Sequence, residues 1–221
     1  AAKLPQLKPG DYRIVCLGNT HHTQVGNVAS CDFSRITFAD GGYFAGETVS
    51  GNDSLYYATT PFTVEPFTGR EDDNKTRLAS SHYDVSVEVA GIPDAGMNAA
   101  AASMPTLEIC GVSPCTDFEN RACGEATDYL LETEYDGGSN LLTARTNIMR
   151  HTDHSQVGVC LRSPDGRTLL AEVNLAEFLA ENPVIDCSRN EVLIPIRMEF
   201  VSGKVVVTVP EWYIEDVKPE F

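Results

Sequence analysis

The sequence is short of basic residues and of long apolar runs. Its 16 lysines and arginines stand against 32 aspartates and glutamates, so the formal charge is −16 and the sequence pI about 4.6. A phosphate backbone repels such a chain, and we expect no nucleic-acid partner. No apolar run approaches the ~20 residues that cross a bilayer, and the first five residues lack the apolar core of a signal peptide. We therefore expect no membrane-spanning helix, and a chain that is a processed form or a fragment.

Sequence motifs of common enzymes are also missing. The chain has no Gly-x-Ser-x-Gly elbow, no His-Glu-x-x-His, no phosphate loop and no dinucleotide fingerprint. Two carboxylates, Glu132 and Glu134, are two residues apart, a spacing that on a strand places both on the solvated face. We predict a protein that is not an enzyme, with no catalytic residues and no cofactor.

Three polar clusters could bind a metal, but none has the required pattern. His151-x-x-His154 falls in a polar connection between two predicted strands, where a solvated loop is the usual structure. His21-His22 follows a Gly-Asn turn and has no carboxylate at ligand spacing, so we expect an exposed loop. Glu71–Asn74 lacks the register of a calcium loop and indicates a solvated face. We predict no metal site.

Cysteine, by contrast, is abundant. Seven cysteines favour an oxidising, extracytoplasmic setting, although several could be buried as small apolar side chains: Cys16, Cys31, Cys110, Cys115, Cys123, Cys160 and Cys187. Three of them cluster between residues 110 and 123, but without the paired spacing and fourth ligand of a zinc site. If six paired, about 105 connectivities would be possible. The sequence therefore leaves open whether disulfides form and which cysteines they join.

The composition favours many short strands. Apolar residues make up 42% of the 221 residues and charged residues 22%, with 17 glycines and 12 prolines. These values suit turns and strands better than long helices, so we predict an all-β protein. Strict alternation resumes at Tyr83–Ala90 after a polar stretch, which indicates that a new unit begins there. We predict two domains, residues 1–80 and residues 81–221.

The last third of the chain has the most definite pattern. Val157–Leu161 and Arg167–Val173 flank a Ser-Pro-Asp-Gly turn and predict a hairpin. Residues 192–201 alternate, turn at Ser-Gly and lead into Val205–Val209, which predicts a second hairpin. We expect one short helix between the two hairpins. Asn174 caps it, its apolar face is formed by Leu175, Phe178 and Leu179, and Pro183 ends it.

Shorter patterns occur earlier. Asp11–Leu17 predicts a strand that ends at a Gly-Asn pair, and Arg35–Phe38 and Leu55–Thr63 have β-like character. Tyr129–Tyr135 and Leu141–Met149, separated by Asp-Gly-Gly-Ser-Asn, predict a further hairpin.

Several short motifs occur in an order that resembles one known family. They are Leu7-x-Pro9-Gly10-x-Tyr12 before the first strand, Gly91-Ile92-Pro93 after the strand Tyr83–Ala90, the Asp117-Phe118 segment, Leu142–Arg145, the Asp165-Gly166 hairpin, the Asn174-Leu175 helix and the closing Val205–Trp212. This order is similar to that of the fimbrial anchor family of Bacteroidales, relatives of the major fimbrillins.

The resemblance implies a lipoprotein of two tandem transthyretin-like β-sandwich domains that anchors or caps a pilus at the outer membrane. In this family picture a lipidated cysteine and the first strands precede Leu4, so we expect a first domain truncated at its N-terminus. A missing strand would leave an open sheet edge beside Asp11–Leu17, unless loops such as residues 41–52 fold over the gap.

We therefore expect a non-enzymatic structural and anchoring subunit of a cell-surface fimbria, which contributes to adhesion and joins other fimbrial subunits by β-strand addition. Contact with the outer membrane would come through the lipidated N-terminus alone. The sequence predicts no individual partner-binding residues. The alternative is a secreted carbohydrate-binding β-sandwich module, for which the candidate aromatic platform is Tyr43, Tyr56, Tyr57 and Trp212.

Overall fold

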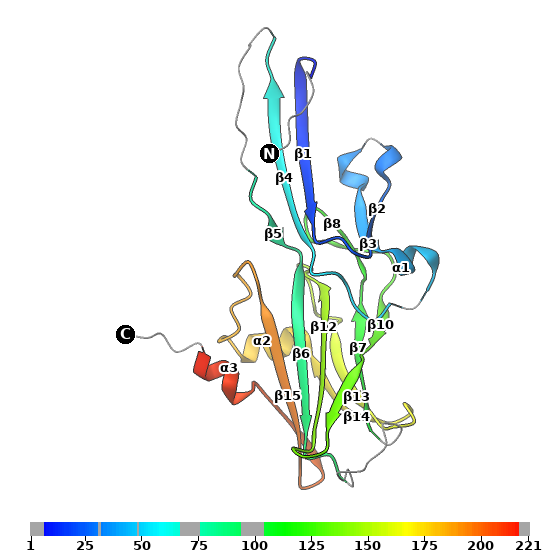
Figure 1. Ribbon diagram of the computed structural model, residues 1–221, viewed down its shortest axis with the longest axis vertical. Coiled ribbons are helices and arrows are strands. Elements are labelled where there is room, and N and C mark those ends of the chain that lie inside the picture. The colour runs from blue at the N-terminus through cyan, green and yellow to red at the C-terminus, as the bar shows by residue number, and fades with distance from the viewer. Residues whose placement is uncertain (1–6, 31, 48, 67–75, 94–103, 217–221) are drawn as a thin grey trace.

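The computed structural model describes residues 7–30, 32–47, 49–66, 76–93 and 104–216, which form an elongated molecule built mostly of strands (Figure 1). The all-β prediction is confirmed. The described helices are short: α1 (Gly41–Ala45), α2 (Leu175–Glu181) and α3 (Glu211–Asp216). The sequence predicted α2 but not the other two. None of the described helices is long and apolar enough to cross a membrane.

Two sheets enclose the main core, and we call them the lower sandwich. One sheet has the order β10-β7-β13-β14 and the other β11-β12-β6-β15-β16, and both supply buried side chains to one core. Their strands are β6 (His82–Ala90), β7 (Thr106–Val112), β10 (Thr127–Leu130), β11 (Thr133–Asp136), β12 (Leu141–Met149), β13 (Gly158–Arg162), β14 (Leu169–Asn174), β15 (Leu193–Val201) and β16 (Lys204–Thr208).

Alternation along the strands builds the core of this sandwich. Side chains of β6 at positions 83, 85, 87 and 89 are 0–5% exposed, as the sequence predicted. Strand β15 runs parallel to β6 and places Ile196 beside Val87, and Ile196 is also fully buried. Because one face of β6 and one face of β15 are apolar throughout, a shift of one residue would turn that face to water, so the pattern fixes the register of these two strands.

The two predicted hairpins at the end of the chain are confirmed as β13–β14 and β15–β16. Helix α2 also begins where predicted, because the Asn174 side chain accepts a hydrogen bond from the Glu177 amide at 3.1 Å. Leu175 and Phe178 are buried and Leu179 packs against the same core. The helix is thereby fixed over the sandwich.

The prediction for residues 129–149 is partly wrong. Tyr129–Tyr135 is not one strand, because β10 pairs with β7 in one sheet and β11 pairs with β12 in the other. The chain changes sheet at Leu131, whose buried side chain joins the core and whose amide donates to the Leu107 carbonyl. A polar and exposed run follows, so the sequence pattern did not reveal this crossing.

Two smaller sheets lie above the lower sandwich, and we call them the upper sheets. They have the orders β1-β4-β5 and β2-β3-β8-β9. Their strands are β1 (Gly10–Gly18), β2 (Thr23–Gly26), β3 (Thr37–Asp40), β4 (Tyr56–Val64), β5 (Ala79–Ser80), β8 (Cys115–Asp117) and β9 (Ala122–Cys123), with 3₁₀ helices at Val28–Ser30 and Phe33–Arg35. The predicted piece Arg35–Phe38 therefore starts as a 3₁₀ turn and becomes a strand at Thr37.

The upper sheets have a small core of their own. Its buried members in the described chain are Phe38, Leu55, Phe118 and Met149. Strands β8 and β9 reach this region from beyond residue 80, and β8 pairs with β3. The division of the chain into domains at residue 80 stays a prediction, and the structure adds that a later segment pairs across that position.

Candidate functional site

Strand β1 is an open sheet edge. All nine of its residues pair with β4, from Gly10 opposite Val64 to Gly18 opposite Tyr56. On its other side no strand of the described chain pairs with it. It is longer than any other strand that ends one of the four described sheets. Such a row of unpaired backbone groups is a ready template for a further strand. We call this side of β1 the β1 edge.

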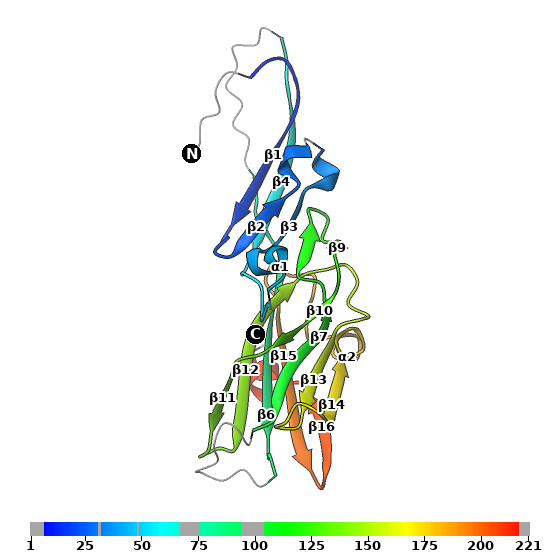
Figure 2. The ribbon, with the colours of Figure 1, turned by 90° about the vertical axis from the view of Figure 1, so that its right-hand side faces the viewer.

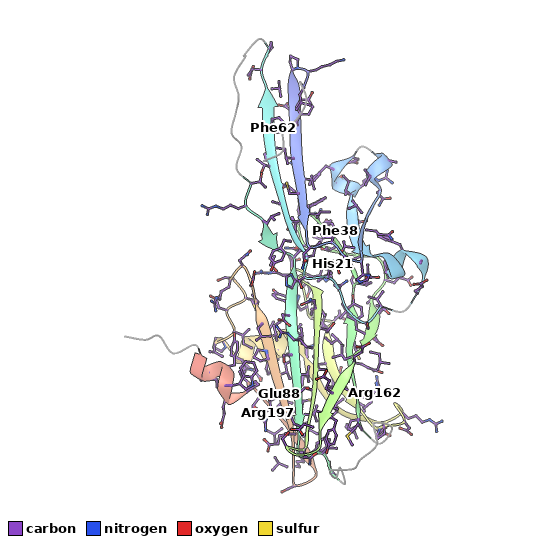
Figure 3. All side chains as sticks on the ribbon, viewed as in Figure 1. His21, Phe38, Phe62, Glu88, Arg162 and Arg197 are labelled. Atoms are coloured by element: carbon purple, nitrogen blue, oxygen red, sulfur yellow. A yellow bond between two sulfur atoms is a disulfide. The ribbon has the colours of Figure 1, made fainter. Side chains whose placement is uncertain are left out.

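The far half of β1 and β4 forms a two-stranded ribbon that extends away from the lower sandwich (Figure 1). Figure 3 places Phe38 at the base of the ribbon and Phe62 toward its tip. Tyr12 stacks on Phe62 with ring centroids 5.5 Å apart, and no residue of β1 is fully buried. A ribbon of two strands is marginally stable alone, so an added strand would stabilise it.

One face of β1 carries an uncovered apolar position. Alternate residues of a strand share a face, so Arg13, Val15 and Leu17 lie on the same face of β1. Leu17 packs against the small upper core, and the Arg13 guanidinium lies 4.2 Å from the ring centre of Phe33. Val15 lies between them and is 38% exposed. The β1 edge therefore combines free backbone groups with an apolar side chain that a neighbouring strand could cover.

The loop that could have covered this edge lies elsewhere. In its described residues, Tyr43 accepts a hydrogen bond from the Glu125 amide at 3.0 Å. The Asn52 side chain accepts one from the Tyr129 hydroxyl at 2.7 Å, and the Asn52 backbone N–H donates to the Asn147 carbonyl. The described part of this segment therefore connects the upper sheets to the lower sandwich and does not cover β1.

A partly exposed hydrogen-bond cluster holds the turn that follows the inner end of β1. One carboxylate oxygen of Asp53 accepts from the amides of His21, His22 and Thr23, each at 2.8 Å, and from the Thr23 hydroxyl at 2.7 Å. Partial burial alone would raise the pKa of Asp53, but these hydrogen bonds outweigh it and lower the pKa. The two histidine side chains are exposed, as predicted, and the backbone at these positions holds the turn.

The second histidine pair differs from its prediction. His151 is 6% exposed, its Nε2 lies 3.2 Å from the Cys115 carbonyl, and His154 Nε2 lies 3.3 Å from the Tyr83 hydroxyl. Burial lowers the pKa of both rings. The connection is a loop, as expected, and residues 152, 153, 155 and 156 are exposed. The expectation is wrong for His151, because β8 packs over the segment that leaves β12. No group of three potential metal ligands occurs among the described residues, and Glu71–Asn74 lies outside them.

One cysteine pairing is now defined. Cys115 and Cys123 form a disulfide that joins β8 to β9. Both belong to the cluster that the sequence singled out, but only their opposition across two short strands selects this pair. The glutamates at positions 132 and 134 are both exposed, as their spacing indicated.

The aromatic residues of the alternative hypothesis contact different neighbours. Tyr56 donates to Glu191 at 2.8 Å, the ring of Tyr57 packs against Phe118, Tyr43 reaches Glu125, and Trp212 donates to Glu88 at 2.9 Å. None of the four stacks on another in the part of the chain that is described. They do not form one flat platform for a sugar ring, and sequence alone could not show this.

Comparison with known proteins gives a family match over nearly the whole chain. The family model for fimbrillin-A associated anchor proteins Mfa1 and Mfa2 matches residues 1–218. No curated protein sequence matches the chain.

Several solved structures share the fold. A candidate adhesin from Bacteroides ovatus has a TM-score of 0.68 at 15% identity, with 93% of this chain and 75% of that chain covered. A candidate polysaccharide-binding protein from Bacteroides thetaiotaomicron has a TM-score of 0.66 at 11% identity, with 95% and 80% covered. The fimbrial anchor protein Mfa2 from Porphyromonas gingivalis has a TM-score of 0.60 at 17% identity, with 92% and 75% covered.

Proposed function

Because the chain belongs to the family of fimbrillin-A associated anchor proteins Mfa1 and Mfa2, we propose that it is a non-enzymatic structural subunit of a cell-surface fimbria. The resemblance that the sequence motifs indicated is thereby confirmed. We propose further that the subunit joins a neighbouring fimbrial subunit by strand addition at the β1 edge and contributes to adhesion. Its place at the outer membrane, through a lipidated N-terminus, is part of the same proposal.

The open edge of β1 is the observation that carries this proposal. An extended segment of another subunit would lie beside β1, and its backbone would pair with the free N–H and C=O groups there. Nine residues provide a long ladder, whereas the other strands that end a described sheet have two to six residues. Length favours β1 because each added residue contributes further backbone hydrogen bonds to the complex.

Side chains would set the register of the added strand. An apolar residue opposite Val15 would cover the exposed part of that side chain, and its neighbours would extend toward Arg13 and Leu17. Slipping the strand by one residue would turn its apolar residues to the opposite face. An alternating apolar segment, typical of a sheet strand in a fimbrial subunit, therefore fits the β1 edge.

The test is to add the terminal strand of a cognate fimbrillin as a peptide and to follow hydrogen exchange of the Arg13–Leu17 amides. We expect the peptide to slow exchange of those amides that β4 leaves unpaired. If the same amides are fully protected in the free monomer and the peptide changes nothing, strand addition at β1 is wrong.

Two matched variants separate the β1 edge from other edges. Val15→Lys puts a charge where the added strand should cover an apolar side chain, and we expect peptide affinity to fall about tenfold or more. Val206→Lys makes the same change on β16, an edge strand of the lower sandwich, at a valine that is 46% exposed. It should leave peptide affinity unchanged. Equal losses in both variants would contradict binding at β1.

A further inference from the structure

Two cysteines outside the described disulfide meet on the outer face of the lower sandwich. Cys110 on β7 and Cys160 on β13 belong to neighbouring strands, with Cys110 opposite Gly158 and Cys160 opposite Glu108. Their Sγ atoms lie 2.8 Å apart, closer than two sulfur atoms normally approach without a bond. We infer that these two cysteines form a second disulfide, which joins the two central strands of the sheet β10-β7-β13-β14.

The surroundings of the pair favour one order of reaction. Cys110 is partly exposed, whereas Cys160 is 3% exposed. An oxidant that carries a disulfide, either an oxidising dithiol protein or oxidised glutathione, can therefore reach Cys110 first. The Cys110 thiolate attacks that disulfide and forms a mixed disulfide as one thiolate leaves. Cys160 then loses its proton and attacks Cys110 Sγ, and the second thiolate of the oxidant leaves. Two thiols are oxidised and one disulfide is reduced.

Local charge and burial affect how fast this exchange runs. Burial raises the pKa of both thiols, the contact between them raises that of Cys160 further, and Glu172 adds to the shift at Cys160. Since the thiolate is the attacking species, the bond forms more slowly at neutral pH than at alkaline pH. The buried sulfur is also shielded from reducing thiols, so the bond persists once it has formed.

The proposed bond would stabilise the protein more than the short one already described. It closes a loop of about 50 residues, whereas Cys115 and Cys123 are eight residues apart. Restricting a longer loop removes more entropy from the unfolded chain. For a protein of this size we expect the additional bond to raise the melting temperature by about 10 °C. This inference does not depend on the proposed fimbrial function.

A tryptic map of the non-reduced protein tests the pairing directly. Cleavage after Arg77, Arg121, Arg150 and Arg162 gives peptide 78–121, which contains Cys110 and Cys115, and peptide 151–162, in which Cys160 is the single cysteine. We expect protein treated with oxidised glutathione at pH 8 to yield peptide 151–162 linked to 78–121, which stays joined through Cys115 and Cys123 to peptide 122–145. Thiol titration of the denatured protein before and after the treatment should show a loss of two free thiols.

Two variants identify the cysteine to which peptide 151–162 is linked. Cys110→Ser should release peptide 151–162, although Cys115 remains in peptide 78–121, and should lower the melting temperature of the oxidised protein. Cys187→Ser is the matched control and should leave both the linked peptides and the melting difference between oxidised and reduced protein unchanged. Peptide 151–162 recovered free from the oxidised wild-type protein, or linked to any cysteine other than Cys110, would overturn the inference.

Discussion

The upper sheets and the lower sandwich use similar strands but bury very different amounts of apolar surface. The described upper core has four buried side chains, whereas the lower core takes buried side chains from all strands of its two sheets except β11 and β16, whose partly buried residues pack against it. The free energy of local unfolding is smaller for regions with few buried contacts than for regions with many. The difference indicates that the lower sandwich supplies most of the stability, and that the upper sheets present the edge through which a partner could bind.

Removing the upper sheets is the most direct way to break this comparison. The lower core takes almost all of its buried residues from positions after residue 80, with Val49 as the described exception. We therefore expect a chain that starts at Ser80 to keep near-ultraviolet circular dichroism and a cooperative urea transition. An unfolded spectrum would remove the proposed boundary and show that the two regions fold as one unit.

Within the intact chain, the largest effect of a single substitution should come from the lower core. Ile196 lies on β15 beside Val87 of β6 and is fully buried in the core that the two sheets share. We expect Ile196→Ala to lower the free energy of unfolding by about 4 kcal/mol, through lost apolar burial and a remaining cavity. Urea unfolding followed by circular dichroism measures this change. Val206→Ala, at an exposed position, is the control and should cost less than about 0.5 kcal/mol.

Truncating the helix side chain should have a slightly smaller effect. Phe178 is 5% exposed and attaches α2 to the sandwich. We expect Phe178→Ala to lower the free energy of unfolding by about 3 kcal/mol, because the packing of the aromatic ring is lost and the cavity can close only in part. An unchanged urea midpoint would mean that α2 contributes little to the core.

A local effect in the upper sheets should come next. Asp53→Ala removes an ionised acceptor of four hydrogen bonds, and we expect it to destabilise the turn before β2 by about 2 kcal/mol. Hydrogen exchange should increase at residues 21–26, while amides of β6 keep their protection. Equal increases in both regions would show that the upper and lower parts unfold together.

The same carboxylate predicts a dependence on pH. Its pKa is lower in the folded protein than the value of about 3.9 in an unfolded chain. The stabilisation by Asp53 is therefore complete above that unfolded value and is lost as the pH falls through the lower, folded value. Protection of residues 21–26 should decrease in this acidic range in the wild type, and Asp53→Ala should remove that decrease.

The smallest effect on stability should come from the β1 edge. Val15→Lys changes an exposed side chain, so we expect the free energy of unfolding to change by less than about 0.5 kcal/mol. A loss as large as that of Ile196→Ala would mean that β1 is already packed in the free protein. Such a result would show that the upper sheets have a stable core of their own that includes Val15.

Sequence patterns predicted the lower sandwich better than the upper sheets, for physical reasons. Residues 83–89 and 192–198 alternate over long strands, so local periodicity alone gives their faces. Strand β8, in contrast, has three residues, and its pairing with β3 joins positions nearly eighty residues apart. The burial of His151 depends on that pairing, and so does the environment of Phe118. Short strands with distant partners leave little periodic signal.

The candidate site was predicted in the same uneven way. The strand Asp11–Leu17 and its open side were expected, the strand from its pattern and the open side from the family resemblance. The role of Asp53 was not, because nothing local links a carboxylate to amides thirty residues earlier. Contact between Cys110 and Cys160 likewise depends on which strands become neighbours. Spatial neighbours of this kind follow from topology and not from spacing in the sequence.

The direction of β1 has a mechanical consequence. The strand runs nearly along the long axis of the molecule in Figure 1 and slants across that axis in Figure 2. Hydrogen bonds between antiparallel strands lie across the strand direction, so a pull along the long axis would load the nine-residue β1–β4 ladder in shear. In shear many bonds share the force and must fail together, whereas peeling breaks them one at a time. A subunit held beside β1 would therefore resist tension along the fibre far better than sideways force.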